Sequence, residues 1–182
     1  MKKNGLKSIL IVVFCACLCV GYFFYLTHKT GGQEAANNEA EMIISKDLEN
    51  SYPKTAREVV KFYNRILKCY YSRGYTEEQL AQIAEQARTL MDEELKAQNP
   101  QDSYLLAVKE DISSFAKDGK EMYNTSVESS NEMEFKKVKG RECAYADVDY
   151  YIKSKKGSQR SSQTFILRRD ADNKWRILGF YQ

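Results

Sequence analysis

The pattern of hydrophobic and polar positions changes twice along this chain of 182 residues. Residues 8–27 form an uncharged apolar run, residues 28–52 are small, polar and acidic, and residues 53–182 mix apolar and polar positions periodically. As a helix, about 20 uncharged residues reach about 30 Å, which matches the hydrocarbon core of a bilayer. We therefore expect a cytoplasmic stub at 1–7, a transmembrane helix at 8–27, a flexible acidic tether at 28–52 and one folded domain at 53–182.

The first half of the domain has the 3.6-residue periodicity of amphipathic helices. Apolar residues recur at this spacing within residues 55–74 and 76–99, and a shorter helix fits residues 103–117. Thr76 and Gln79 have the spacing of a capping box at the start of the second helix. The sequence therefore predicts three helices, each with one apolar face.

In the second half of the domain the periodicity changes to that of strands. Segments rich in aromatic and β-branched residues lie at 132–140, 142–157, 159–170 and 173–182, separated by short Gly, Ser, Asp or Asn turns. Alternate residues from Ala144 to Ile152 form an apolar face that should meet the helices. These patterns predict an α+β domain in which three helices pack on one side of a curved antiparallel meander sheet.

The order of the elements and the ending W-x-I-x-G-F resemble the nuclear transport factor 2-like superfamily, a cystatin-like cone. The residues of this ending are Trp175, Ile177, Gly179 and Phe180. With the apolar run in front, the chain resembles membrane-tethered proteins of Gram-positive bacteria. The resemblance implies a cone-shaped cavity between helices and sheet, which relatives use for ligand binding, for isomerase or dehydratase chemistry, or as an assembly surface. The fold alone does not choose among these uses.

Charge and flanking residues predict the location of the domain. Lys2, Lys3 and Lys7 precede the apolar run without any acidic residue, so the positive-inside rule predicts a cytoplasmic amino terminus and a carboxy-terminal domain outside the cell membrane. The lipid bilayer, contacted through residues 8–27, is thus one expected partner. A signal peptide cleaved between residues 31 and 36 is the alternative. The net charge of +3 is too small and too mixed for a nucleic-acid-binding protein.

The five cysteines give no sign of a metal site. On a helix, Cys15 and Cys19 share one face and Cys17 points to the opposite one, so the three cannot converge on one ion. They also lack the flanking residues of a lipidation signal, and we interpret them as ordinary apolar residues of the span. Cys69 and Cys143 could form a disulfide outside the cell or remain as core thiols.

Residues suited to acid–base catalysis are few. The only histidine, His28, borders the apolar run, so the domain has no histidine for proton transfer or metal binding. Asp147 and Asp149 lie two residues apart on one strand face, between Tyr145 and Tyr151. They fit either a general base beside tyrosine donors or cross-strand ion pairs with Arg168 or Arg169 of the next strand.

The aromatic content is high, with 13 tyrosines in the chain. Tyr70, Tyr71, Tyr75, Tyr104 and Tyr123 are too many for one core, and some of them should line a pocket or a partner surface.

These observations predict a membrane-anchored extracytoplasmic binding or interaction module without catalytic residues, metal or cofactor. An alternative is a subunit of an envelope or conjugation-type assembly, with protein partners in the envelope. A third hypothesis is a small-molecule isomerase or dehydratase that uses the cone cavity.

Overall fold

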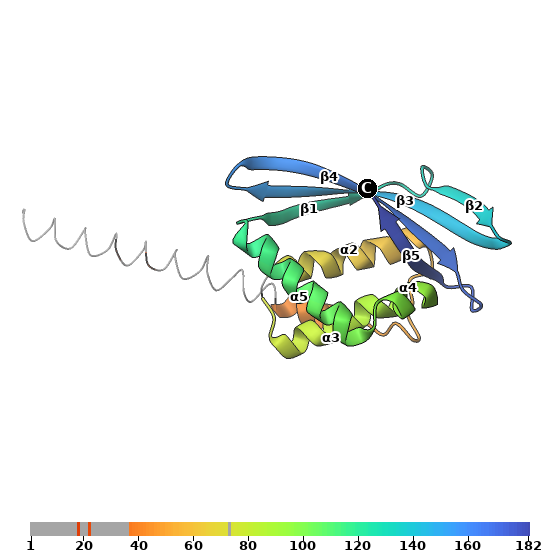
Figure 1. Cartoon of the computed structure of the whole chain (residues 1–182), viewed down its shortest axis with the longest axis horizontal. Helices are drawn as coiled ribbons and strands as arrows, with labels where there is room; N and C mark the ends of the chain where they lie inside the picture. The colour runs from red at the N-terminus through yellow and green to blue at the C-terminus, as the bar shows by residue number, and fades with distance from the viewer. Residues whose placement is uncertain (1–17, 19–21, 23–36, 73) are drawn as a thin grey trace, which may run out of the picture.

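The computed structural model describes residues 18, 22, 37–72 and 74–182. This part of the chain folds as an α+β unit, with helices covering one side of a five-stranded antiparallel sheet (Figure 1). Within these residues, no helix combines the length and apolar character needed to cross a bilayer. Apart from Leu18 and Tyr22, the predicted span lies outside the described residues, as does the predicted cytoplasmic stub.

The helices largely follow the predicted periodicity. They are α2 (Ala56–Ser72), α3 (Glu77–Thr89), α4 (Glu93–Gln98) and α5 (Gln101–Lys117). The capping box at the start of α3 is confirmed. The Gln79 N–H donates to Thr76 Oγ1 at 3.1 Å, and the Thr76 N–H donates to Gln79 Oε1 at 2.8 Å.

The prediction of one helix over residues 76–99 is wrong, because the chain breaks there between α3 and α4. At the break the Asp92 N–H donates to the Ile177 carbonyl at 2.8 Å, and the Ile177 N–H donates to the Leu90 carbonyl at 2.8 Å. In a continuous helix, the Asp92 N–H and the Leu90 carbonyl would form hydrogen bonds within the helix, but here both bond to Ile177. The last strand therefore ends α3, and Asp92 then caps the separate helix α4.

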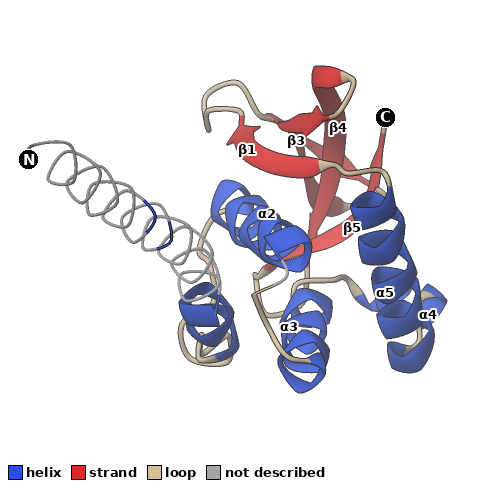
Figure 2. Ribbon diagram, turned by 90° about the vertical axis from the view of Figure 1, so that its left-hand side faces the viewer, coloured by secondary structure: helices blue, strands red, loops and turns tan. Residues whose placement is uncertain are grey.

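The sheet contains the predicted meander and one further strand. Its strands are β1 (Glu121–Val127), β2 (Glu134–Val138), β3 (Arg141–Ser154), β4 (Gly157–Arg169) and β5 (Trp175–Tyr181). Strands β2 to β5 form the meander, and their three hairpins lie where the turn residues predict them. Figure 2 shows the sheet as one twisted layer with the labelled helices on the same side.

The sequence prediction omitted strand β1. Both β1 and β2 pair antiparallel with β3, β1 with residues 148–153 and β2 with residues 141–145. They therefore form two parts of one interrupted edge strand. Arg57 of α2 donates to the Glu128 carbonyl at 2.7 Å, which satisfies a backbone acceptor inside the interruption.

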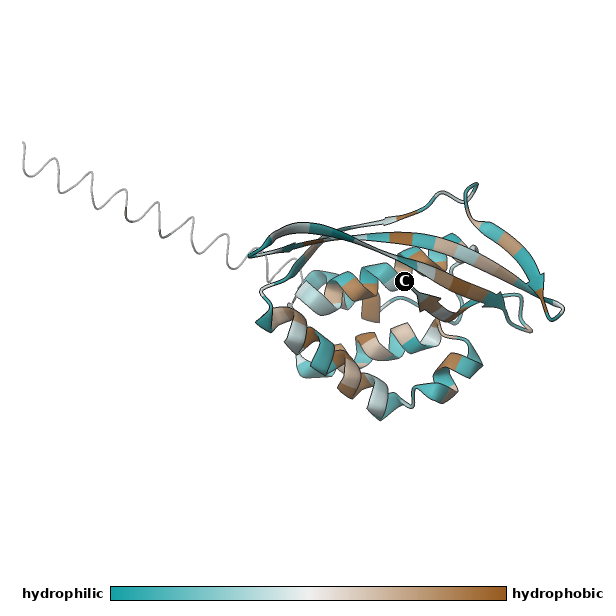
Figure 3. Cartoon of the chain, turned by 45° about the horizontal axis from the view of Figure 1, so that its top comes forward, coloured by the Kyte–Doolittle hydropathy of each residue, from teal (hydrophilic) through white to brown (hydrophobic). Residues whose placement is uncertain are grey.

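The hydrophobic core lies between the helices and the inner face of the sheet. On the predicted inner face of β3, Ala144, Ala146, Val148 and Tyr150 are buried and Ile152 is half-buried. Hydrophilic and hydrophobic bands alternate along the strands (Figure 3). Fully buried residues include Val59, Val60, Ile66, Ile83, Leu90, Phe165, Leu167 and Ile177. The Phe165 ring meets Tyr63 of α2 edge-on, with 5.7 Å between centroids. This contact joins the buried face of α2 to the inner face of β4.

The folded unit begins earlier than predicted, since residues 37–52 do not form a flexible tether. Residues 37–44 are helical, and Ala40, Ile43 and Leu48 are buried in the same core as α2 and α3. The Gln86 side chain of α3 donates to the carbonyls of Ile44 and Lys46 at 3.0 and 3.1 Å. The sequence suggests an amphipathic turn around residues 42–44, but the acidic composition of the segment gave no sign that its apolar side packs on the domain.

Candidate functional site

The four residues predicted as a polar site lie on the outer face of the sheet, away from the helices. Asp149 accepts hydrogen bonds from Arg160 and Ser162, both at 2.6 Å, and Asp147 accepts one from Thr164 at 2.6 Å. The hydrogen bond from Arg160 lowers the pKa of Asp149. Both aspartates are thus engaged by side chains of β4, although the arginine is Arg160 rather than Arg168 or Arg169.

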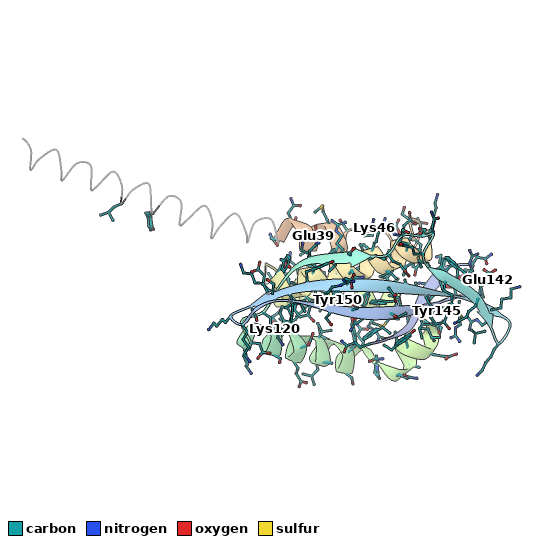
Figure 4. All side chains as sticks on the ribbon, turned by 90° about the horizontal axis from the view of Figure 1, so that it is seen from above. Glu39, Lys46, Lys120, Glu142, Tyr145 and Tyr150 are labelled. Atoms are coloured by element: carbon teal, nitrogen blue, oxygen red, sulfur yellow. The ribbon has the colours of Figure 1, made fainter. Side chains whose placement is uncertain are left out.

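The two tyrosines of that group also make surface contacts. The Lys136 ammonium lies 4.0 Å from the centroid of the Tyr145 ring, and the Tyr151 ring lies 6.1 Å from that of Tyr123. In Figure 4, Tyr145 lies toward the same end of the sheet as Glu142. None of these residues lines the cavity between the helices and the sheet.

A cavity of about 440 Å³ lies between α2, α5 and the inner face of the sheet. Its lining is largely aromatic and aliphatic, with Tyr63, Tyr70 and Tyr71 from α2, Tyr104, Val108 and Phe115 from α5, and Met122, Tyr150, Ile152, Phe165 and Phe180 from the strands. A cavity of this size and composition is typical of small-molecule sites.

Two tyrosines that line this cavity, Tyr70 and Tyr150, have buried hydroxyls without a hydrogen-bond partner among the described residues, and Tyr150 is the one on the sheet. Its side chain is 4% exposed, and its hydroxyl has no hydrogen-bond partner among the described residues. Burial raises the pKa of Tyr150, so the hydroxyl keeps its proton at physiological pH and can donate it. A buried donor without a partner is rare in folded proteins and indicates a place where a ligand or water would bind.

Three further tyrosine hydroxyls gather at the same cavity. Burial raises the pKa of Tyr63, Tyr70 and Tyr104, and each of these hydroxyls interacts electrostatically with another of the three. They are therefore neutral hydrogen-bonding groups at physiological pH, because the charged phenolate would lose hydration inside the cavity.

An exposed aspartate, Asp111, lies among the polar residues that line the cavity. The Tyr71 hydroxyl donates to the Asp111 carboxylate, and the Tyr71 ring stacks on Phe115 with 4.1 Å between centroids. Asp111 is exposed, and its side chain is the one Asp or Glu side chain among the described residues that line the cavity. It thus marks the rim, whereas Tyr150 marks the interior.

The two cysteines of the domain are separate free thiols in this structure. Burial raises the pKa of Cys69 to about 11, so this side chain is a protonated core group and not a nucleophile at neutral pH. Cys143 is also buried. In the part of the chain that the structure describes, no group of His, Cys, Asp or Glu side chains is arranged to hold a metal ion.

Sequence reasoning predicted part of this site and missed its central residue. Tyr70, Tyr71 and Tyr104 line the cavity, as the excess of tyrosines suggested. Tyr150 was expected only as one of the alternating core residues of its strand. The signal that could have identified it is a hydroxyl placed on an otherwise apolar strand face.

Comparison with known proteins gives a family but no assigned activity. The family model described as Domain of unknown function (DUF6715) matches residues 1–180, and the chain belongs to this family. One solved structure similar to part of the chain is the helical cell shape determining protein Pgp2 (K307A mutant) from Campylobacter jejuni, at a TM-score of 0.32 and 10% identity. The similarity covers 70% of this chain and 41% of that one, and it carries no argument about function. A search of curated proteins gives no match.

Proposed function

We propose that this member of the DUF6715 family is a membrane-anchored binding module that takes a small ligand into the cavity between α2, α5 and the sheet. The observation that carries the proposal is the Tyr150 hydroxyl, a buried donor that lines a cavity of about 440 Å³ without a partner among the described residues. Leaving such a group unpaired is destabilising by about 1 to 3 kcal/mol, and an acceptor on a ligand would remove that penalty.

The lining supports binding rather than catalysis. Its tyrosines have raised pKa values and remain protonated donors at neutral pH. A general base must lie within hydrogen-bond reach of the proton that it removes, whereas the carboxylate of Asp111 is exposed at the rim and accepts from Tyr71. The cavity is therefore equipped to hold and orient a ligand more than to transfer its protons.

The positions of the polar groups define the ligand chemistry. The inner end offers hydroxyl donors around Tyr150, the walls are aromatic and aliphatic, and the rim has the Asp111 carboxylate. We propose a neutral, flat or alicyclic apolar body with an oxygen acceptor at its inner end. An anionic group at the outer end would be repelled by Asp111.

Fold and location support the same proposal. The helices that cover one side of a twisted antiparallel sheet agree with the nuclear transport factor 2-like resemblance, whose cone places a cavity in this position. The uncharged run at 8–27 and the lysines before it support an anchor with the domain outside the cytoplasm. The described unit begins at residue 37, so residues 28–36 could separate it from such a span by at most about 30 Å.

The test is a binding experiment on the full chain in lipid nanodiscs. The probe is 2-naphthol, observed by saturation-transfer NMR, with empty nanodiscs giving the background from lipid. We expect saturable transfer to the chain and its loss, by about tenfold or more, in Ala107→Trp, because Ala107 is an exposed lining residue and an indole there would obstruct the mouth of the cavity.

The matched control is Leu106→Trp, at the neighbouring, exposed position of α5. This variant adds the same side chain outside the cavity lining and should bind the probe like the natural chain. Equal transfer in both tryptophan variants would place the probe elsewhere and refute the proposed site.

A further inference from the structure

A second cleft lies at the other end of the sheet, where the strands extend past the helices. Figure 1 shows the β2–β3 hairpin reaching beyond the first turn of α2. The cleft has a volume of about 530 Å³ and is lined by Lys54 and Thr55 before α2, by Phe135 and Lys137 of β2, and by Arg169 and Trp175. It shares no lining residue with the cavity of the proposed function.

The floor of this cleft is aromatic. Trp175 is only 4% exposed, and Phe135 packs edge-on against it with 5.8 Å between ring centroids. Phe135 is nevertheless 56% exposed. An aromatic side chain held in place by a buried tryptophan, with more than half of its surface in water, is typical of a surface that a partner covers.

The charges around this floor are mainly positive. Lys54, Lys137 and Arg169 line the cleft, and the Arg169 guanidinium lies 4.7 Å from the centre of the Trp175 ring. Glu142 is the one carboxylate in the lining, and it already pairs with Arg169 at 3.1 Å. The cleft therefore has an excess of positively charged side chains next to an aromatic surface. This combination favours binding of a ligand that carries anionic groups beside an apolar one.

The neighbouring strand offers a further means of recognition. Within the described residues β2 pairs only with β3, so its other edge presents backbone groups to solvent. An extended peptide can hydrogen-bond to such an edge while its side chains enter adjacent pockets. This feature favours a polypeptide over a free organic acid as the occupant.

We infer that this cleft docks a short acidic segment of a partner protein. An apolar side chain of the segment lies against Phe135 and Trp175, and its carboxylates face Lys54, Lys137 and Arg169. In Figure 4, Glu142 lies near one end of the domain, and Glu39, near the start of the described unit, lies away from that end. A domain anchored through its amino-terminal end would thus present this cleft away from the bilayer.

Trp175 supplies the measurement, because it is the only tryptophan of the chain. The full chain in nanodiscs is titrated with the peptide acetyl-Glu-Asp-Phe-Glu-Asp-amide while the tryptophan emission is recorded. We expect a saturable change in emission that weakens by about tenfold in 0.5 M salt, since exposed charge pairs are screened. The basic peptide acetyl-Lys-Lys-Phe-Lys-Lys-amide should give no saturable change.

Two variants test the residues of the cleft. Phe135→Ala and Lys137→Glu should each weaken binding of the acidic peptide by about tenfold or more. Lys155→Glu, an exposed lysine in the β3–β4 hairpin, makes the same charge change outside the cleft lining and should have little effect. Thermal unfolding checks that all three variants are folded. We expect them to be, because Phe135, Lys137 and Lys155 are exposed.

Three outcomes would overturn the inference. Binding of 3-phenylpropionate as tight as that of the peptide would indicate a site for small organic acids. Equal binding of the basic peptide, or unchanged affinity in Phe135→Ala and Lys137→Glu, would exclude this recognition chemistry. The test is independent of the proposed ligand cavity, because Tyr150→Phe, which changes that cavity without adding a second tryptophan, should leave the response of Trp175 to the peptide unchanged.

Discussion

Asp92 and Arg168 form an ion pair that joins the break between α3 and α4 to strand β4. The Arg168 guanidinium donates to both carboxylate oxygens of Asp92, with Nε 3.1 Å from Oδ2. The Asp92 side chain is 3% exposed and that of Arg168 13%. Asp92 also caps α4 by accepting a hydrogen bond from the Glu94 N–H. The same carboxylate therefore binds the Arg168 guanidinium and a backbone N–H at the start of α4.

Replacing Asp92 by alanine should lower the free energy of unfolding by about 3 kcal/mol, because Arg168 would lose its inner partner and α4 its cap. Urea unfolding of the full chain in micelles, followed by circular dichroism, measures the change. Glu93→Ala, next to it but exposed, should stay within about 0.5 kcal/mol. Equal effects of the two substitutions would show that the pair does not stabilise the domain.

The same carboxylate makes stability depend on acid. Burial alone would raise the pKa of Asp92, but the hydrogen bonds from Arg168 and from the Glu94 N–H outweigh it and lower the pKa below the usual value. A depressed folded-state pKa contributes stability above the unfolded pKa, about 3.9, and that contribution disappears as pH falls through the folded value. Unfolding free energy should therefore decrease from about pH 5 to pH 2, and this slope should be shallower in Asp92→Ala.

The docked segment at residues 37–44 should stabilise the domain. Ile43→Ala removes a fully buried side chain from the contact with α2 and α3 and should lower the unfolding free energy by about 3 kcal/mol. Met42→Ala, at the neighbouring exposed position, should change it by less than about 1 kcal/mol. If Ile43→Ala unfolds like the natural chain, this segment is not part of the cooperative unit.

The Tyr150 hydroxyl should affect ligand binding without supporting the fold. Tyr150→Phe removes a buried donor that has no partner among the described residues, so stability should be unchanged or raised by up to about 1 kcal/mol. Binding of 2-naphthol should weaken by about tenfold, because its oxygen loses the inner donor. Tyr145→Phe, on the outer face of the sheet, should alter neither quantity, and a loss of stability in Tyr150→Phe would mean that the hydroxyl already has a structural partner.

The orientation of the chain can be measured in whole cells. Thr30→Cys places a thiol just beyond the apolar run, where the proposed topology exposes it to an impermeant maleimide added outside. Labelling is compared with that of the natural chain, whose five cysteines give the background. Asn4→Cys, before the run, should remain unlabelled until the cells are opened, and labelling of Asn4→Cys alone would reverse the orientation.

The sequence predicted the elements that local periodicity determines. Helix α2 and the β3 to β5 hairpins follow from apolar spacing and turn residues, because each buries one regular face. The break at Leu90 to Asp92 was missed because no glycine or proline marks it, and the hydrogen bonds to Ile177 that hold it open come from a distant strand. Strand β1 was missed for the same reason, because its polar residues become a strand through pairing with β3.

The candidate site depends even more on tertiary arrangement. The pair Asp147 and Asp149 was identifiable from strand alternation, yet alternation alone cannot decide whether an acid serves a site or a cross-strand contact. The cavity combines Tyr104 of α5 with Tyr150 of β3, and no spacing along the chain relates two such residues. The excess of tyrosines indicated a pocket, but only the packing of α5 over the sheet identifies its members.

The helix at residues 37–44 makes the domain insensitive to how its amino-terminal end is processed. Cleavage between residues 31 and 36, the alternative to an anchor, would remove none of the described core, whose first buried residue is Ala40. A released form would thus retain both the tyrosine-lined cavity and the cationic cleft. One folded unit could then serve at the membrane or diffuse away from it, and the difference between the two would be its local concentration near other membrane proteins.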